Sequence, residues 1–295
     1  MKRLQWMLIC LMMPSIAWAF NEYAIAKRVQ ASMLVTGLIA INADGSVYGY
    51  SLDEREKLPG DVINLIGETI PGWKFEPVKV NGKPVLAKAL MSLRIVARKD
   101  SRGQFRASIE GARFAQDTAQ SLKSPACANG ACLMPSYRKP PAYPIELLRE
   151  GVSGTAYVVL RVNREGRVTD AAIRQIDLRK VADESQLKRW RLALAHASLA
   201  VVGDWKFNIP TRGDEANRDS WVVSVPINYI LEGITPPLTY GQWDAYVPGP
   251  VQDIPWASDE AGRTASNRSA DAVPDNGIAF IADRRFVLLT PLSPG

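Results

Sequence analysis

Asn163-Arg164-Glu165-Gly166-Arg167-Val168, followed downstream by Trp205-Lys206-Phe207, is the stretch that decides the fold, because the chain contains this pattern twice. The other copy is Asn42-Ala43-Asp44-Gly45-Ser46-Val47, followed by Trp73-Lys74-Phe75. In both copies apolar residues alternate before the glycine, a helical pattern precedes the tryptophan, and a long alternating run follows it. Two copies at this spacing predict two small domains of one kind and not a solenoid, which needs more and shorter repeats.

The first copy predicts a domain over residues 22–99. Gly45 provides the positive φ that a short hairpin loop requires, so strands are expected on both sides of it. Apolar residues recur at helical spacing over 62–70, between two prolines that open and stop a helix. Every second residue from 85 to 95 is apolar, which is typical of a half-buried strand.

The second copy predicts a domain over residues 140–232. Tyr143-Pro144 begins a short helix, and strands flank Gly166. A long helix is expected over 185–202, with Asp183 or Ser185 as its cap. The last strand spans 221–231 and contains Pro226, which has no N–H to donate to a ladder. This strand, or one side of it, is therefore expected at the edge of the sheet.

Residues 100–139 are polar and proline-rich, which indicates a linker between the two domains. Cys127 and Cys132 flank an Asn-Gly turn, so we expect a disulfide between them that holds the linker.

Residues 233–295 form a tail with prolines and large aromatic rings. Over 236–256 it is expected to lie along a domain surface with Trp243, Tyr246 and Trp256 docked, because exposed tryptophans are costly. Residues 277–290 predict a terminal hairpin that packs back on the chain. At the edge over 221–231 it would block a partner strand; elsewhere it would leave that edge open.

The N-terminus indicates export. A basic start, an apolar core and Ala17-Trp18-Ala19 predict a signal peptide over residues 1–19, with an uncleaved membrane anchor as the alternative. The leader contains Lys2 and Arg3, so its removal lowers 36 basic residues to 34 against 30 acidic ones, a net charge of +4. That charge is too small for a nucleic-acid surface.

The composition argues against an enzyme. The single histidine, His196, has no nucleophile signature around it, and no glycine spacing matches a phosphate loop. We predict no catalytic residue, no metal site and no cofactor. The aromatic pairs Trp73/Phe75 and Trp205/Phe207 are expected to close the core against the helices, with ligand contact as the alternative.

The second copy resembles the C-terminal domain of the TonB family of cell-envelope energy transducers. The resemblance covers about 90 residues and rests on elements in the family's order: Tyr143-Pro144, the run 154–168 with Gly166, Trp205-Lys206-Phe207, and Val225-Pro226-Ile227. The first copy is similar through Gly45, Trp73 and Phe75, but it lacks the Tyr-Pro pair and the proline of the last strand.

The resemblance implies an α+β fold in which a helix covers a short antiparallel sheet. It also implies a periplasmic protein that binds outer-membrane receptors by strand addition at the last strand. The residues at the matching positions are Val223, Val225, Ile227 and Tyr229. The leader has no histidine and no long proline-rich spanner follows it, so an accessory TonB-like protein is expected and not a complete transducer. The alternative is an envelope scaffold that self-associates through its sheet edges, for example as a homodimer.

Overall fold

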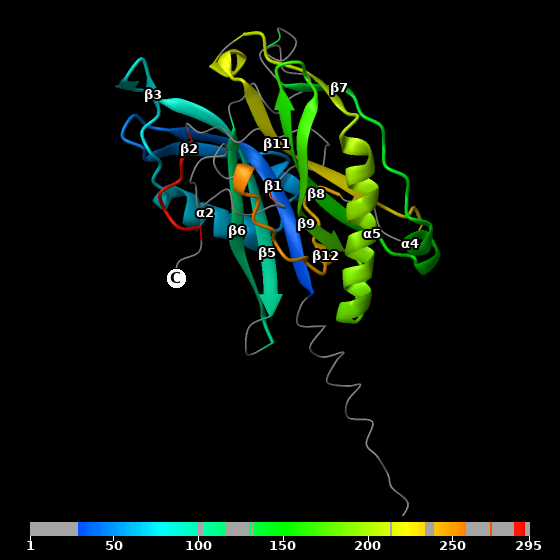
Figure 1. Ribbon diagram of the computed structural model, residues 1–295. Coiled ribbons are helices and arrows are strands. Elements are labelled where there is room, and N and C mark those ends of the chain that lie inside the picture. The colour runs from blue at the N-terminus through cyan, green and yellow to red at the C-terminus, as the bar shows by residue number, and fades with distance from the viewer. Residues whose placement is uncertain are drawn as a thin grey trace, which may run out of the picture.

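Two antiparallel sheets lie between two helices in this α+β protein, and the predicted fold class is confirmed. The computed structural model describes residues 29–99, 103–115, 130, 133–212, 214–233, 239–257, 272 and 286–292. In Figure 1 helix α2 lies at the left and helix α5 at the right, with the strands of both sheets between them. The leader, Cys127 and Cys132, and most of the expected hairpin 277–290 lie outside the described residues.

The first sheet is built around one long strand, β1 (Gln30–Ile41). Strand β5 (Ala87–Lys99) pairs along nearly all of it, and its other side is shared by β2 (Val47–Leu52) and β12 (Asp244–Tyr246). Helix α2 (Gly60–Thr69) packs its buried face on the core of this unit. Short elements complete the first unit: the 3-10 turns η1 (Arg55–Lys57) and η2 (Ile70–Gly72), and the hairpin strands β3 (Lys79–Val80) and β4 (Lys83–Pro84).

The expected linker over 100–139 is wrong in two places, because strands form there. Strand β6 (Phe105–Ala115) extends the first sheet beyond β5. Ile95 pairs with Ile109 and Arg94 pairs with Gly111, so Glu110 is an extra residue in a bulge. The bulge breaks the period-two pattern, since Ile109 is buried and the next buried apolar side chain is Ala112. Strand β7 (Met134–Tyr137) pairs with β10 (Lys206–Asn208) in the second unit.

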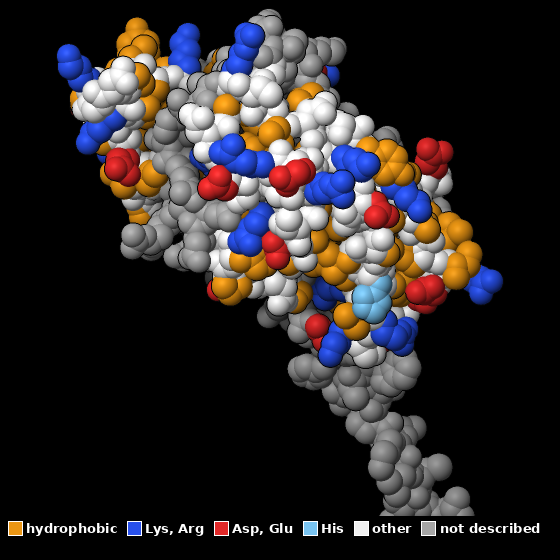
Figure 2. Space-filling model, turned by 45° about the horizontal axis from the view of Figure 1, so that its top comes forward, with side chains coloured by type: hydrophobic (Ala, Val, Ile, Leu, Met, Phe, Trp, Pro, Cys, Tyr) orange, Lys and Arg blue, Asp and Glu red, His pale blue; other side chains and the backbone are white. Residues whose placement is uncertain are grey.

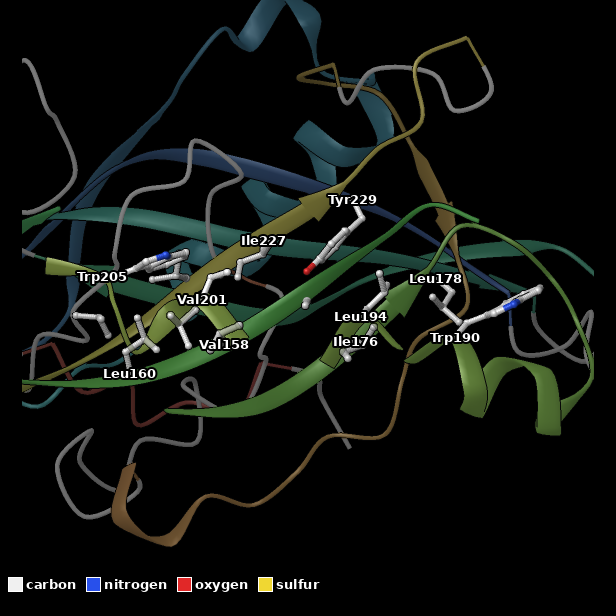
Figure 3. Packing of buried hydrophobic residues seen from close by; sticks show 14 of the residues in the cluster. Val158, Leu160, Ile176, Leu178, Trp190, Leu194, Val201, Trp205, Ile227 and Tyr229 are labelled. Carbon is white, nitrogen blue, oxygen red and sulfur yellow. The ribbon is translucent and has the colours of Figure 1, made fainter. Parts of the chain in front are cut away.

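The second sheet has β8 (Gly154–Asn163) in the middle, between β9 (Val168–Leu178) and β11 (Ser220–Tyr229). Helix α5 (Glu184–Val202) begins at Asp183, whose side chain accepts a hydrogen bond from the Gln186 N–H at 2.9 Å. Side chains from this helix pack with those of the sheet in one core, among them Val158, Leu160 and Leu194 (Figure 3). The short elements are α4 (Ile145–Glu150) and the 3-10 turn η4 (Asp214–Asn217).

The two glycine turns have the same hydrogen-bond geometry. Gly45 has φ 83° and accepts a 2.8 Å bond from the Phe75 N–H; Gly166 has φ 71° and accepts a 2.8 Å bond from the Phe207 N–H. A Cβ on either glycine would lie about 2 Å from the phenylalanine carbonyl oxygen, at 2.0 Å and 1.9 Å. Each turn therefore clamps the Trp-Lys-Phe strand of its own unit, and only glycine fits.

The tail joins the two sheets. Tyr246 pairs with Gln30 of β1, and Val247 exchanges two main-chain bonds with Leu178 of β9, at 2.7 and 3.1 Å. The segment 244–247 thus lies between the edges of both sheets. Arg179 and Asp244 form a bidentate ion pair at this junction, with an Nη2–Oδ2 distance of 2.9 Å.

The aromatic rings of the tail differ in their burial. Tyr246 is buried. Trp256 packs against the small cluster of Val159, Ile254 and Ala257, and the Arg161 guanidinium lies 4.9 Å from its ring centroid. The expectation of docked rings is wrong for Trp243, which is 39% exposed because it lies in the turn before β12.

We predict that Gly166→Ala lowers the free energy of unfolding by about 3 kcal/mol, because alanine must adopt a positive φ and displace the Phe207 carbonyl. Urea unfolding followed by circular dichroism measures this change. Gly203→Ala is the control, since Gly203 has φ −62° and open space around it. Equal stability of the two variants would contradict the clamp.

Candidate functional site: the open edge of strand β11

Strand β11 is the edge of the second sheet. It pairs with β8, and no other described strand pairs with its second side. Pro226 lies in the middle of this edge, where the sequence led us to expect an edge strand. An edge of this kind is where an extended peptide can add to a sheet through main-chain hydrogen bonds.

The four side chains predicted to contact a partner point into the protein. Val223, Val225, Ile227 and Tyr229 are at most 6% exposed and belong to the core beneath α5 (Figure 3). Their period of two, which identified the strand, is also the reason why they face inward. A strand added at this edge would meet the main chain of these residues, while Ser224 and Asn228 lie on the opposite face.

The Tyr-Pro pair fixes the end of β11. The Tyr143 ring packs edge-on against the Tyr229 ring, with a centroid distance of 5.6 Å, and its hydroxyl donates to the Val152 carbonyl. The Tyr229 hydroxyl lies 2.9 Å from Ser198 Oγ of α5. Burial raises the pKa of both Tyr143 and Tyr229 above the usual tyrosine value. Pro144 is the residue before α4, and Tyr143 contacts β11, so the Tyr-Pro pair connects the start of this helix with the edge strand.

A groove runs beside the middle of β11. It has a volume of about 380 Å³ and lies between the strand and the segment 138–141; its lining residues are Arg138, Lys139, Pro140, Pro141, Trp205, Pro226, Ile227 and Asn228. Trp205 is 2% exposed and donates its indole N–H to the Lys139 carbonyl at 2.9 Å. The Arg138 guanidinium lies 4.8 Å from the Trp205 ring centroid. We call this feature the β11 groove.

The chemistry of the β11 groove is basic and partly apolar. Arg138 and Lys139 contribute two cations, and Trp205 and the prolines contribute an apolar floor. Packing against the ring lowers the pKa of the Arg138 guanidinium by desolvation, but an arginine stays protonated at neutral pH. The groove can therefore accept an acidic or carboxylate-bearing side chain of a segment that lies along the strand.

Sequence reasoning did not identify residues 138–141 as part of a site: it assigned Arg138 and Lys139 to the linker, and Pro140 and Pro141 to the start of the second domain. One signal was present: two basic residues precede Pro140-Pro141, and two prolines in a row hold the chain extended beside the edge. The motif residues Gly166 and Trp205 were found, and the structure gives both a packing role.

Two further features of the described surface concern possible metal ligands and the distribution of charge. Among the described residues there is no group of three or more His, Cys, Asp or Glu side chains placed to hold a metal. His196 is exposed on α5, and acidic and basic side chains are interspersed on the face in Figure 2.

Compared with protein-family models, with curated proteins and with solved structures, the chain gives no match. In the part of the chain that the structure describes, no helix is both long enough and apolar enough to cross a membrane.

We predict that stability falls as the pH rises above about 10, the usual tyrosine pKa. The pKa of Tyr229 is raised in the folded state. Its contribution to the free energy of unfolding is therefore fully present below the pKa that the residue has in the unfolded chain. This contribution is lost as the pH rises through the pKa of the folded state. Tyr229→Phe should cost about 1 kcal/mol at pH 8, through the lost bond to Ser198, and should make the decline above pH 10 shallower. Urea midpoints at pH 8, 10 and 11 test this, with Tyr137→Phe, at a 51% exposed position, as the control.

Proposed function

We propose that the chain is a non-enzymatic TonB-like binding protein of the bacterial cell envelope. The leader over 1–19 would export it to the periplasm. There it binds extended segments of outer-membrane receptors, or of other envelope proteins, by β-strand addition in TonB-dependent transport. The observation that carries this proposal is the open edge of β11 beside the β11 groove.

The edge and the groove together provide two kinds of recognition. The main chain of β11 supplies affinity without regard to sequence, and Pro226 interrupts the row of donors, which limits the registers a bound strand can take. Arg138 and Lys139 favour a segment with an acidic side chain over the groove.

The geometry of the motif residues supports the TonB-like assignment. Gly166 holds Phe207 through its main chain, and Tyr143 holds Tyr229 through its ring. These contacts bring the residues of the resemblance into one unit whose last strand is the open edge. The missing histidine in the leader favours an accessory binding protein over a complete energy transducer.

We predict that synthetic peptides from receptor N-termini bind saturably and shift the amide resonances of residues 221–229 and 138–141. The double substitution Arg138→Glu with Lys139→Glu should weaken binding by about tenfold, which corresponds to 1.4 kcal/mol. The double substitution Lys79→Glu with Lys83→Glu in the exposed β3–β4 hairpin is the charge-matched control and should leave the affinity unchanged. Shifts confined to other regions, or no saturation, would overturn the proposal.

A second candidate function is an envelope scaffold that self-associates through sheet edges. It is favoured by the tail, which already pairs as a strand with β1. Proline on an edge strand hinders pairing between molecules. If β11 is the self-association edge, Pro226→Val should lower the dissociation constant of a homodimer about tenfold in sedimentation velocity. Pro84→Val in the β3–β4 hairpin is the control, and a monomer for both variants at all concentrations would exclude this candidate.

A further inference from the structure

The Trp-Lys-Phe strand of the first unit has a neighbour from the far end of the chain. Leu288 lies opposite Phe75 in an antiparallel bridge. The Glu76 N–H donates to the Val287 carbonyl at 2.9 Å, and the Leu289 N–H donates to the Lys74 carbonyl at 2.8 Å. The Lys74 N–H donates to Thr290 Oγ1 at 2.8 Å. Residues 286–290 are therefore an added strand, held largely by main-chain atoms.

Two side chains of this added strand enter the first core. Phe286 and Leu288 are 5% and 4% exposed and belong to the core that contains Trp73, Phe75 and Phe114. Those three rings pack edge to face, with centroid distances of 4.9 to 6.4 Å. The side chain of Leu289, whose N–H donates to the Lys74 carbonyl, is 61% exposed. The segment thus buries two large apolar side chains that are two positions apart, Phe286 and Leu288, and exposes the side chain of Leu289 to solvent.

The second unit has a strand at the same place, from a different source. There β7 pairs with β10, and Phe207 lies opposite Pro135 as Phe75 lies opposite Leu288. Strand β7 lies a few residues before the second unit in the sequence. The added strand 286–290, by contrast, lies more than 200 residues after the strand that it pairs with. The same acceptor edge is filled by different donors, so the position of the donor in the chain does not determine which strand binds.

In the first unit, the added strand 286–290 leaves one buried atom of the Trp-Lys-Phe strand without a hydrogen bond in the described part of the chain. Trp205 Nε1 donates to the Lys139 carbonyl, in the segment that follows β7. The matching atom, Trp73 Nε1, is buried in a side chain that is 1% exposed and has no hydrogen-bond partner among the described residues. A buried N–H without a partner costs free energy that a ligand with a carbonyl at this point would recover.

We infer that the edge at Lys74–Glu76 is a strand-acceptor site for extended peptides with two large apolar side chains two positions apart. Residues 286–290 are its intramolecular ligand and hold it closed. The site lies in the first unit, away from the β11 groove, and goes beyond the proposed function. Failure at one site is distinguishable from failure at the other, because the variants that test them are separate.

The test uses the full chain with Leu288→Asp, which places a charge in the apolar pocket and expels the segment, and a fluorescent peptide of residues 286–292. The variant should melt on the order of 5–10 °C lower than the unmodified chain and should bind the peptide at least tenfold more tightly. The unmodified chain binds weakly because its own segment competes at a high effective concentration. Leu289→Asp is the matched control: its side chain faces solvent, so this variant should stay closed and behave like the unmodified chain.

Equal peptide binding by Leu288→Asp and Leu289→Asp would overturn the inference. A second measurement decides the case in which Leu288→Asp does not fold. In the Leu289→Cys variant, a spin label on the exposed position reports whether the segment is docked. Excess peptide 286–292 should mobilise the label, and the same peptide with Leu288→Asp should not. A label that stays immobile with both peptides rules out an exchangeable site.

Discussion

The main-chain bond between each glycine turn and its Trp-Lys-Phe strand is the interaction on which both units depend. In the second unit the Phe207 N–H reaches the Gly166 carbonyl, and the close approach leaves no room for a Cβ. The contact fixes the hairpin of β8 and β9 relative to β10, the strand that follows α5. Trp205 then closes the core from the strand's side. The first unit repeats this clamp with Gly45 and Phe75, although its other residues differ.

The tail is part of the structure and not an appendage. It contributes a strand to the first sheet, exchanges two bonds with Leu178 of the second, and places Asp244 against Arg179 at the junction. The two units also meet directly: the Arg94 guanidinium, 6% exposed, donates to Ser32 Oγ at 3.0 Å and to the Tyr157 hydroxyl at 3.4 Å. A buried cation of this kind is costly unless it is hydrogen-bonded, which makes the relative placement of the units specific.

The distribution of strand edges gives the molecule its functional character. The outer side of each Trp-Lys-Phe strand is covered by another part of the same chain, β7 in one unit and residues 286–290 in the other. Among the described strands, β11 has one side without a strand neighbour; this side contains Pro226 and is bordered by the β11 groove. The proposed strand addition would use this arrangement, in which some described edges are covered and the edge of β11 lies beside a basic groove.

The sequence by itself determined the elements whose signals are local. Gly45 and Gly166 adopt a positive φ, and the alternation over 221–231 places its odd-numbered residues on a buried face. The cap of α5 was narrowed to Asp183 or Ser185, and the structure shows that it is Asp183. These follow from steric and periodic rules that act within a few residues. The α+β class and the edge position of β11 followed from them.

Only the tertiary structure decided which distant segments complete the sheets. The alternation in β6 is interrupted by a bulge at Glu110, and β7, β12 and residues 286–290 are too short for a period to identify them. The β11 groove also depends on contact across the fold, because Arg138 and Lys139 are brought to the edge by the Trp205 bond to a main-chain carbonyl. A main-chain pairing between distant residues, such as Gln30 with Tyr246 or Lys206 with Tyr137, leaves no mark in the local sequence, since any residue except proline can donate and accept in it.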